Sequence, residues 1–376
     1  MLPSHIICQT LLDQGVSFFT GVPDSLLKDI CAYITDNVAD DRHVIAANEG
    51  AAAALASGWH LATGEMGLVY LQNSGLGNLV NPLMSLADPE VYSIPMILLI
   101  GWRGEPGIPD EPQHRKQGRV TMETLQTLGV SCEVLPDTAE EAVNVIKSGV
   151  RIARENKAPH ALIVKKGSFE PYKLQGKPAD AFIMRREEAI KLTLDLIEAK
   201  AVVVSTTGMA SREVFEHREA QGEGHARDFL TVGCMGHASQ IAMGIALAKP
   251  DAPVYCLDGD GAVLMHMGSL AISGTSGLRN FKHIVINNGA HDSVGGQPTA
   301  ALEVDIPAIA KACGYRWVAS AHEPELLRQL LEEMKEVRGP AFLEIKVNKG
   351  NRADLGRPTT TTHENKKSFM EFLKAI

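Results

Sequence analysis

The chain has 376 residues, of which 45% are hydrophobic and 22% charged, and its net charge is −9. This length suits two α/β domains, and the acidic balance with no Lys/Arg run excludes a surface built for nucleic acid or membranes. The six cysteines are scattered without a CxxC pair, and the start resembles no signal peptide, which indicates a cytoplasmic protein with reduced thiols.

The first half alternates short apolar runs with segments of helical periodicity, which predicts a doubly wound parallel-sheet domain over residues 1–167. The predicted strands are Val16–Thr20, His43–Ala47, Leu68–Gln72, Pro95–Ile100 and Ala161–Lys165. The predicted helices are Ala51–Thr63, Leu79–Ala87, Thr121–Leu128 and Glu140–Glu155.

Residues 168–184 interrupt this alternation with Pro171, Gly176 and Pro178, which is typical of an interdomain linker. The α/β pattern then resumes and predicts a second doubly wound domain over residues 185–347, followed by a polar tail, 348–376, with a terminal helix near Lys367–Lys374. The further predicted strands are Ala201–Ser205, Phe229–Val232, Arg316–Ala319 and Ala341–Val347. The further predicted helices are Glu187–Glu198, Ala238–Ala248, Ile306–Cys313 and Glu325–Val337.

Two polar stretches in the second domain, Gly259-Asp260-Gly261 and Asn287-Asn288, each follow an apolar run. These runs read as neighbouring parallel strands joined by a crossover helix, so the two stretches should meet where open α/β sheets bind ligands. A carboxylate and an amide oxygen beside glycines suit Mg²⁺ carrying a diphosphate. Ordinary tight turns are the alternative for either stretch alone. The flanking segments are Val254–Leu257, Ala262–Ser273 and His283–Ile286.

The pair resembles the GDG…NN signature of thiamine-diphosphate (ThDP) enzymes, which combine a pyrimidine-binding domain with a diphosphate-binding domain. The resemblance implies Mg²⁺ ligands from the side chains of Asp260 and Asn288 and from the carbonyl of Ala290. The amide groups at the start of the following helix would hold the diphosphate. Residues implied to bind the cofactor in the second domain are Gly208, Met209, Gly233, Met235, Asp260, Gly261, Ala262 and Asn288. Core packing is the alternative for Met235.

The first domain must supply a glutamate that hydrogen-bonds N1′ of the cofactor and so promotes formation of the C2 ylide. Glu49 lies between a predicted strand and an alanine-rich helix, in Asn48-Glu49-Gly50-Ala51, and this segment resembles the family's glutamate segment. A helix N-terminal glutamate that favours the helix dipole is the alternative. In the family this glutamate reaches a cofactor held by another subunit, which implies a homo-oligomer with active sites between subunits.

The absence of a middle domain narrows the resemblance to the short decarboxylases of phosphonopyruvate and sulfopyruvate. The implied reaction converts 3-phosphonopyruvate to phosphonoacetaldehyde and CO₂ in phosphonate biosynthesis. Two alternatives remain: the substrate is sulfopyruvate, or the chain is a ThDP-binding subunit without activity. A ThDP oxidoreductase is disfavoured because the sequence has no group of cysteines that could hold an Fe–S cluster. The matching segments are Thr20–Leu27, Gln72–Asn78, Gly104–His114, Ser293–Thr299 and Arg352–Thr359.

Polar residues in these segments are candidates to act on the small-molecule substrate. Asp24, Ser25 and His114 are expected to line the space above C2, where protons must be delivered. Loop capping is the alternative for Asp24 and Ser25, and a structural role in its loop is the alternative for His114. An anionic phosphonate needs cationic hydrogen-bond donors, and four arginines are candidates for this role. For each of them, the alternative is an ordinary solvated arginine on the protein surface. The candidates are Arg103, Arg115, Arg352 and Arg357.

Overall fold

The computed structural model describes residues 1–176 and 181–376. The chain divides into two compact units, one of residues Met1–Lys177 with Ser293–Gln297, and one of Pro178–Asp292 with Pro298–Ile376. Part of the predicted linker, residues 177–180, lies outside the described residues. Within the described ranges, no helix has both the length and the hydropathy needed to cross a bilayer.

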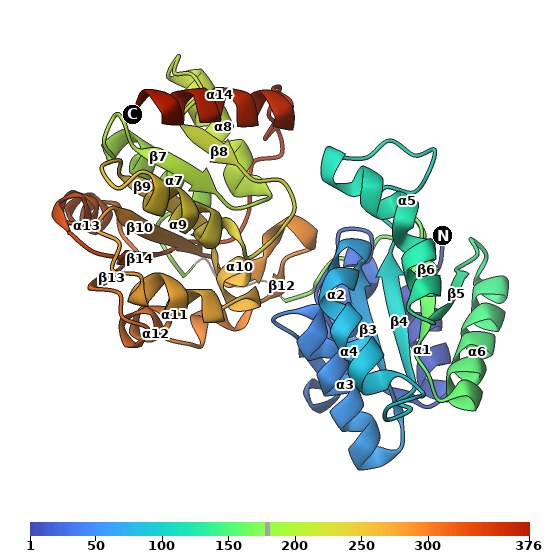
Figure 1. Ribbon diagram of the computed structural model, residues 1–376. Coiled ribbons are helices and arrows are strands. Elements are labelled where there is room, and N and C mark those ends of the chain that lie inside the picture. The colour runs from blue at the N-terminus through green and yellow to red at the C-terminus, as the bar shows by residue number, and fades with distance from the viewer. Residues whose placement is uncertain (177–180) are drawn as a thin grey trace. The chain divides into compact units, whose positions relative to one another are not determined.

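The first unit contains a six-stranded parallel sheet in the order β2-β1-β3-β4-β6-β5 (Figure 1). Its strands are β1 (Val16–Gly21), β2 (His43–Ile45), β3 (Met66–Gln72), β4 (Met96–Gly101), β5 (Ser131–Val134) and β6 (His160–Val164). Its helices are α1 (Ser4–Asp13), α2 (Lys28–Asn37), α3 (Glu49–Thr63), α4 (Leu76–Pro82), α5 (Pro112–Thr127) and α6 (Ala139–Asn156). Apolar side chains of α1, α2 and α6 pack on one face and those of α3, α4 and α5 on the other. Burial from both faces explains why β1 and β4 are buried along their whole length.

The second unit contains another six-stranded parallel sheet, in the order β8-β7-β9-β10-β14-β13. Its strands are β7 (Val202–Ser205), β8 (Asp228–Leu230), β9 (Val254–Gly259), β10 (Phe281–Asn287), β13 (Trp317–Ala321) and β14 (Ala341–Lys346). Its helices are α7 (Arg186–Leu196), α8 (Met209–Ala220), α9 (Ala238–Ala248), α10 (Asp260–Met265), α11 (Gly268–Thr275), α12 (Ile306–Ala312), α13 (Pro324–Glu336) and α14 (Thr362–Ala375). Side chains of α7, α8 and α13 cover one face, and those of α9 to α12 and α14 the other. Two short strands, β11 (Ala290–His291) and β12 (Gln297–Pro298), form a separate pair.

The two sheets have the same topology. When the strands of each sheet are numbered by their order in the chain, both sheets read 2-1-3-4-6-5. The connection therefore reverses direction between the first and third strands, which are β1 and β3 in one unit and β7 and β9 in the other. Ligands of such sheets bind outside the carboxyl ends of the strands at this reversal. The prediction of two doubly wound parallel sheets is confirmed.

Several predicted elements differ from those in the structure. The predicted helix Ala262–Ser273 is two helices, because His266 leaves helical conformation (φ −133°, ψ 49°) between α10 and α11. The predicted helix Leu79–Ala87 ends at Pro82, which has no N–H to continue the ladder, and a π-helical turn follows. The terminal helix begins earlier than expected, at Thr362, because a capping box between Thr361 and Glu364 closes its first turn. Helices and strands that the sequence did not predict are α1, α2, α8, β5, β11 and β12.

Candidate active site

The GDG and NN stretches lie at the carboxyl ends of neighbouring strands, as predicted. In the parallel pair β9 and β10, Ile286 lies opposite Gly259, so Asp260 and the two asparagines leave the sheet side by side. Asp260 is 4% exposed and begins α10, and its Oδ2 accepts a hydrogen bond of 2.6 Å from Thr299 Oγ1. Burial raises the pKa of Asp260 to about 6, although the Thr299 hydrogen bond lowers it.

The two asparagines have different surroundings. Asn287 is fully buried and its Nδ2 donates to Glu344 Oε1 at 2.8 Å and to the carbonyl of Ala301 at 3.0 Å, which makes it a structural residue. Asn288 is only partly buried, and its Oδ1 accepts the N–H of Ala290 at 3.1 Å. One lone pair of Oδ1 is left for a cation. The second asparagine is therefore the one that can serve as a metal ligand.

Gly261, next to Asp260, lies between two side chains. A Cβ atom added to Gly261 would lie 3.1 Å from Cε1 of His291 and 3.3 Å from Cε of Met235, so a side chain would fill the space between them. Met235 is half-buried, so core packing does not occupy its whole side chain. Gly233, two residues before it, has φ +64° and donates its N–H to Thr207 Oγ1 at 2.9 Å.

The segment after β7 reaches the same edge of the sheet. β7 pairs with β9, and Thr207 and Gly208 follow it at the reversal of the sheet. Gly208 has φ +94°, a conformation that favours glycine, and its neighbour Met209 begins α8. The backbone N–H groups at this helix start face an edge that already carries Asp260, which suits an anion held with a cation.

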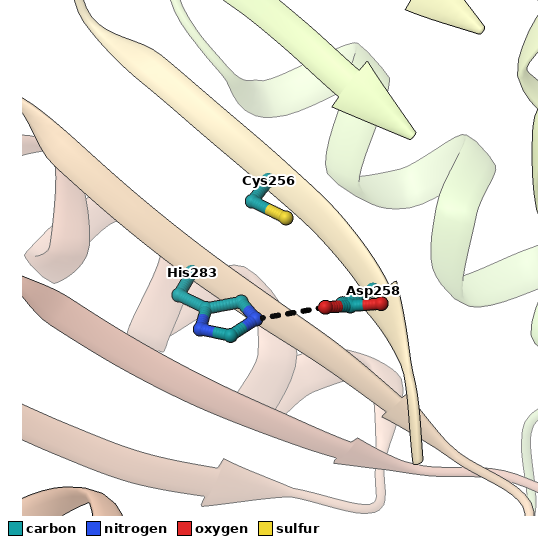
Figure 2. A group of neighbouring side chains, drawn as sticks. All are labelled: Cys256, Asp258 and His283. Atoms are coloured by element: carbon teal, nitrogen blue, oxygen red, sulfur yellow. Dashed lines mark hydrogen bonds and ion pairs between the residues drawn. The ribbon is translucent and has the colours of Figure 1, made fainter. Parts of the chain in front are cut away.

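A buried polar group lies in the strands beneath the GDG turn (Figure 2). Cys256 and Asp258 on β9 and His283 on β10 are all at most 1% exposed, and their ligand-type atoms lie within 4.8 Å of one another. Both ring nitrogens of His283 have hydrogen-bonding neighbours, Asp258 Oδ2 at 3.4 Å and the hydroxyl of Tyr315 at 3.0 Å. Asp258 Oδ1 also accepts the N–H of Gly259 at 3.0 Å, so we interpret the group as support for the turn that carries Asp260.

In the first unit, Glu49 is held where α3 begins. Asn48 caps α3 by accepting the N–H of Ala51 at 2.9 Å, which places Glu49 in the first helical turn. Glu49 is 5% exposed, and its Oε2 accepts a hydrogen bond of 2.7 Å from Asn78 Nδ2. Its carboxyl group contacts Gly75 so closely that a Cβ atom there would collide with it.

Asp24 is completely buried at the end of β1. Its Oδ1 accepts a hydrogen bond of 2.5 Å from Gln72 Nε2, at the end of β3, and its Oδ2 accepts the N–H of Leu26 at 2.9 Å. Burial raises the pKa of Asp24, against the hydrogen bond from Gln72. The end of β3 and the turn that follows it therefore contact both carboxyl groups. Gln72 donates to Asp24, and Gly75 lies against Glu49.

Arg103 and His114 belong to the same region of the first unit. Arg103 Nη1 donates to Ser25 Oγ at 2.9 Å, and its Nε and Nη2 form a bidentate pair with Asp110 at 2.8 and 2.5 Å. His114 is 7% exposed, and its Nδ1 has no hydrogen-bond partner among the described residues. Burial, with the positive charge of Arg103 second, lowers the pKa of His114 to about 4. Asp24, Ser25, Arg103 and His114 therefore lie in one polar region of the first unit.

The other predicted arginines have different surroundings. Arg352, in the second unit, forms ion pairs with Glu187, Glu216 and Asp354, and its Nε lies 2.9 Å from Glu187 Oε2. Arg115 follows His114 on α5 and is exposed, and Arg357 is exposed in the tail.

The residues of both units match the binding domains of one family of enzymes. The family models described as the N-terminal and C-terminal TPP binding domains of thiamine pyrophosphate enzymes match residues 2–125 and 206–345. The phosphonopyruvate decarboxylase of Streptomyces viridochromogenes is 35% identical to this chain, over 96% of this chain and 93% of its own. That of Streptomyces hygroscopicus is 36% identical, over 99% of this chain and 94% of its own. The chain belongs to the phosphonopyruvate decarboxylase family of thiamine pyrophosphate enzymes. The sulfopyruvate decarboxylase of Methanosarcina acetivorans is more distant, with 24% identity over 99% of this chain and 97% of its own.

Four residues near the predicted site of this thiamine pyrophosphate enzyme were missed by the sequence reasoning. Gln72, Asn78, Thr299 and Asp292 each hydrogen-bond a predicted site residue. Three of them lie in segments that had been matched to the family, Gln72–Asn78 and Ser293–Thr299, so membership in these segments was the available signal. Asp292 lies just before the second segment and carried no signal of its own.

Proposed function

We propose that the protein decarboxylates 3-phosphonopyruvate to phosphonoacetaldehyde and CO₂, in phosphonate biosynthesis. The observation that carries this proposal is the 35–36% identity to two phosphonopyruvate decarboxylases over nearly the full length of each chain. Sulfopyruvate is the second candidate substrate, because a sulfopyruvate decarboxylase also aligns over the full length, at 24% identity.

We propose that Mg²⁺ is bound by the side chains of Asp260 and Asn288 and by the carbonyl of Ala290, and that it holds the diphosphate of the cofactor. Oxygen ligands of this kind, few in number, suit Mg²⁺ that keeps phosphate oxygens in its shell. The residues fit the cofactor: Gly261 leaves a space between Met235 and His291 that any side chain would fill. The Asp260 pKa of about 6 is that of a buried carboxylate which gains from a nearby cation. The N–H groups of Gly261 and Ala262, and those at Gly208 and Met209, are the proposed donors to the diphosphate.

When bound, thiamine diphosphate supplies a carbon nucleophile and an electron sink for the loss of CO₂. Glu49 is proposed to hydrogen-bond N1′ of the aminopyrimidine, and Asn78 keeps its carboxyl group oriented for that contact. The Gly233 carbonyl is proposed to accept the aminopyrimidine N–H, with Met235 beneath the rings. Burial raises the pKa of Asp24, which is proposed as a proton donor on the substrate side of the site, with Ser25 and His114 as further polar groups there.

The phosphonate group is proposed to bind near Arg103. The Arg103 guanidinium already donates to Ser25 and forms a bidentate pair with Asp110. A phosphonate that replaced Asp110 could accept the same two hydrogen bonds. Arg115, exposed on the same helix as His114, is the second proposed donor. Arg352 would first have to leave Glu187 and Glu216, and Arg357 stays a prediction.

We further propose a cytoplasmic homo-oligomer with active sites between subunits. Large apolar side chains on and after α3 are exposed in the first unit, which supports burial against another chain. Leu61 is 71% exposed and Tyr92 67% exposed, with Leu55, Met84 and Val91 also exposed. Sedimentation velocity of the purified protein tests this: a monomer at micromolar concentration would contradict it.

Steady-state kinetics with phosphonopyruvate, sulfopyruvate and pyruvate, in the presence of thiamine diphosphate and Mg²⁺, tests the proposed activity. We expect the highest kcat/KM for phosphonopyruvate, with formation of phosphonoacetaldehyde. Inertness toward all three acids, with the cofactor still bound, would support a binding subunit without activity. Glu49→Gln should lower kcat by orders of magnitude while cofactor binding persists, and a wild-type rate in this variant would contradict the assigned role.

A further inference from the structure

The carboxyl group of Asp292 joins three parts of the second unit at the loop that follows the NN stretch. Its Oδ2 accepts hydrogen bonds from Arg186 Nη1 at 2.9 Å, from the N–H of Gly350 at 2.9 Å and from Asn288 Nδ2 at 3.4 Å. Arg186 comes from α7, Gly350 from the tail, and Asn288 is the proposed metal ligand. The Asp292 side chain therefore connects the Asn288 side chain to α7 and to the tail.

Asp292 is held in place by an ion pair with Arg186. Arg186 is 7% exposed and forms a bidentate pair with Glu213 on α8, with Nε and Nη2 each 2.9 Å from a carboxylate oxygen. Its third nitrogen donates to Asp292, so the guanidinium is shared between two carboxylates. Oδ2 of Asp292 is thus the acceptor of a charge-assisted hydrogen bond from Arg186 and of the hydrogen bond from the N–H of Gly350.

The acceptor oxygen of Asp292 determines which way the amide group of Asn288 points. The NH₂ group of Asn288 donates to Oδ2 of Asp292, so Oδ1 is turned to the opposite side. That side holds the N–H of Ala290, whose carbonyl is the third proposed metal ligand. The contact of 3.4 Å is long, which leaves the loop room to tighten around a cation.

We infer that Asp292 is a positioning residue for the metal site: it holds the amide of Asn288 with its oxygen toward Mg²⁺, and Arg186 and Glu213 hold Asp292 in place. This inference rests on the proposed Mg²⁺ site.

A double-mutant cycle on Mg²⁺ affinity tests this role. Mg²⁺ is titrated by calorimetry into protein saturated with thiamine diphosphate, for wild type, Asp292→Asn, Asn288→Asp and the double variant. We expect Asp292→Asn to raise the Kd for Mg²⁺ by about 10- to 100-fold, the range for residues that orient a metal ligand. An aspartate at position 288 has two equivalent oxygens and needs no orientation, so in that background Asp292→Asn should cost nothing or improve binding.

The control is Asp195→Asn, which removes one half-exposed carboxylate from the same unit, where Asp195 is hydrogen-bonded to His217. Its Mg²⁺ affinity should match the wild type. A purely structural role for Asp292 predicts a lowered unfolding midpoint and the same loss of affinity in both backgrounds at position 288, and that result overturns the inference. Asp292→Ser serves in the cycle where Asp292→Asn does not fold.

The proposed activity and this inference fail in different ways. If the wild-type protein binds Mg²⁺ with the cofactor but turns over none of the three keto acids, the proposed decarboxylase activity is wrong. The double-mutant cycle on Mg²⁺ affinity can still be interpreted in that case. Wild-type protein that binds no Mg²⁺ overturns the inference.

Discussion

Thr299→Val isolates the hydrogen bond that stabilises the Asp260 carboxylate, without changing Asp260 itself. Thr299 Oγ1 donates to Asp260 Oδ2 at 2.6 Å, and valine keeps the shape of the side chain while removing the donor. The carboxylate is 4% exposed, so water does not readily replace the lost bond. The variant should therefore retain a proton on Asp260 that Mg²⁺ must displace.

The size of the effect follows from the pKa of Asp260. A hydrogen bond to a charged acceptor contributes about 1.5–3 kcal/mol, and 1.36 kcal/mol corresponds to one pKa unit, so the variant's pKa rises from about 6 to about 7 or 8. At pH 7 the proton is then present on roughly half to nine-tenths of the molecules, against about one-tenth in the wild type. The apparent Kd for Mg²⁺ should rise about 2- to 10-fold at pH 7.

Mg²⁺ titration at pH 5.5 to 9 measures this effect. A raised carboxyl pKa means that the proton competes at low pH, so wild-type affinity should fall about tenfold per pH unit below 6, and in the variant already below 7 or 8. Above pH 9 the two curves should converge, because the hydrogen bond stabilises the free and the metal-bound carboxylate alike. Thr299→Ser, which keeps the hydroxyl, is the control. A constant ratio of affinities across the whole pH range would refute the reasoning.

Three further predictions concern the first unit. Gly75→Ala should lower kcat at least tenfold because a Cβ atom there collides with the Glu49 carboxyl, whereas Gly77→Ala, with open space around it, should leave kcat unchanged. The unfolding free energy, measured with urea, should fall as the pH drops from 6.5 to 4, because burial lowers the pKa of His160 to about 4 while the unfolded chain protonates near 6.5. His160 accounts for up to about 3 kcal/mol of this loss, so His160→Gln should make the slope shallower by that amount, and the slope that remains belongs to other buried histidines such as His114. Asp24→Asn, which cannot deliver a proton, should lower kcat more than it raises KM, and an equal change in both would argue against its role as a proton donor.

The sequence by itself determined the fold class, the cofactor family and the candidate metal ligands. Alternating apolar runs and helical segments follow from the burial of both faces of a parallel sheet, so the pattern of elements could be read directly. Asp260 and Asn288 could be paired because adjacent parallel strands end at the same edge of a sheet. Glu49 was found because it lies between a strand and an alanine-rich helix in a segment that resembles the family's own.

Only the tertiary structure decided which residues hold these groups in place. Thr299, Asn78 and Asp292 act through hydrogen bonds made by side chains whose identity alone implies no role, since Thr, Asn and Asp are equally common in plain loops. The structure likewise separated Asn288, whose oxygen can reach a cation, from Asn287, whose amide is committed to Glu344. Such distinctions depend on which atoms meet across distant segments, and no local pattern encodes them because hydrogen bonding is set by three-dimensional contact rather than by spacing in the chain.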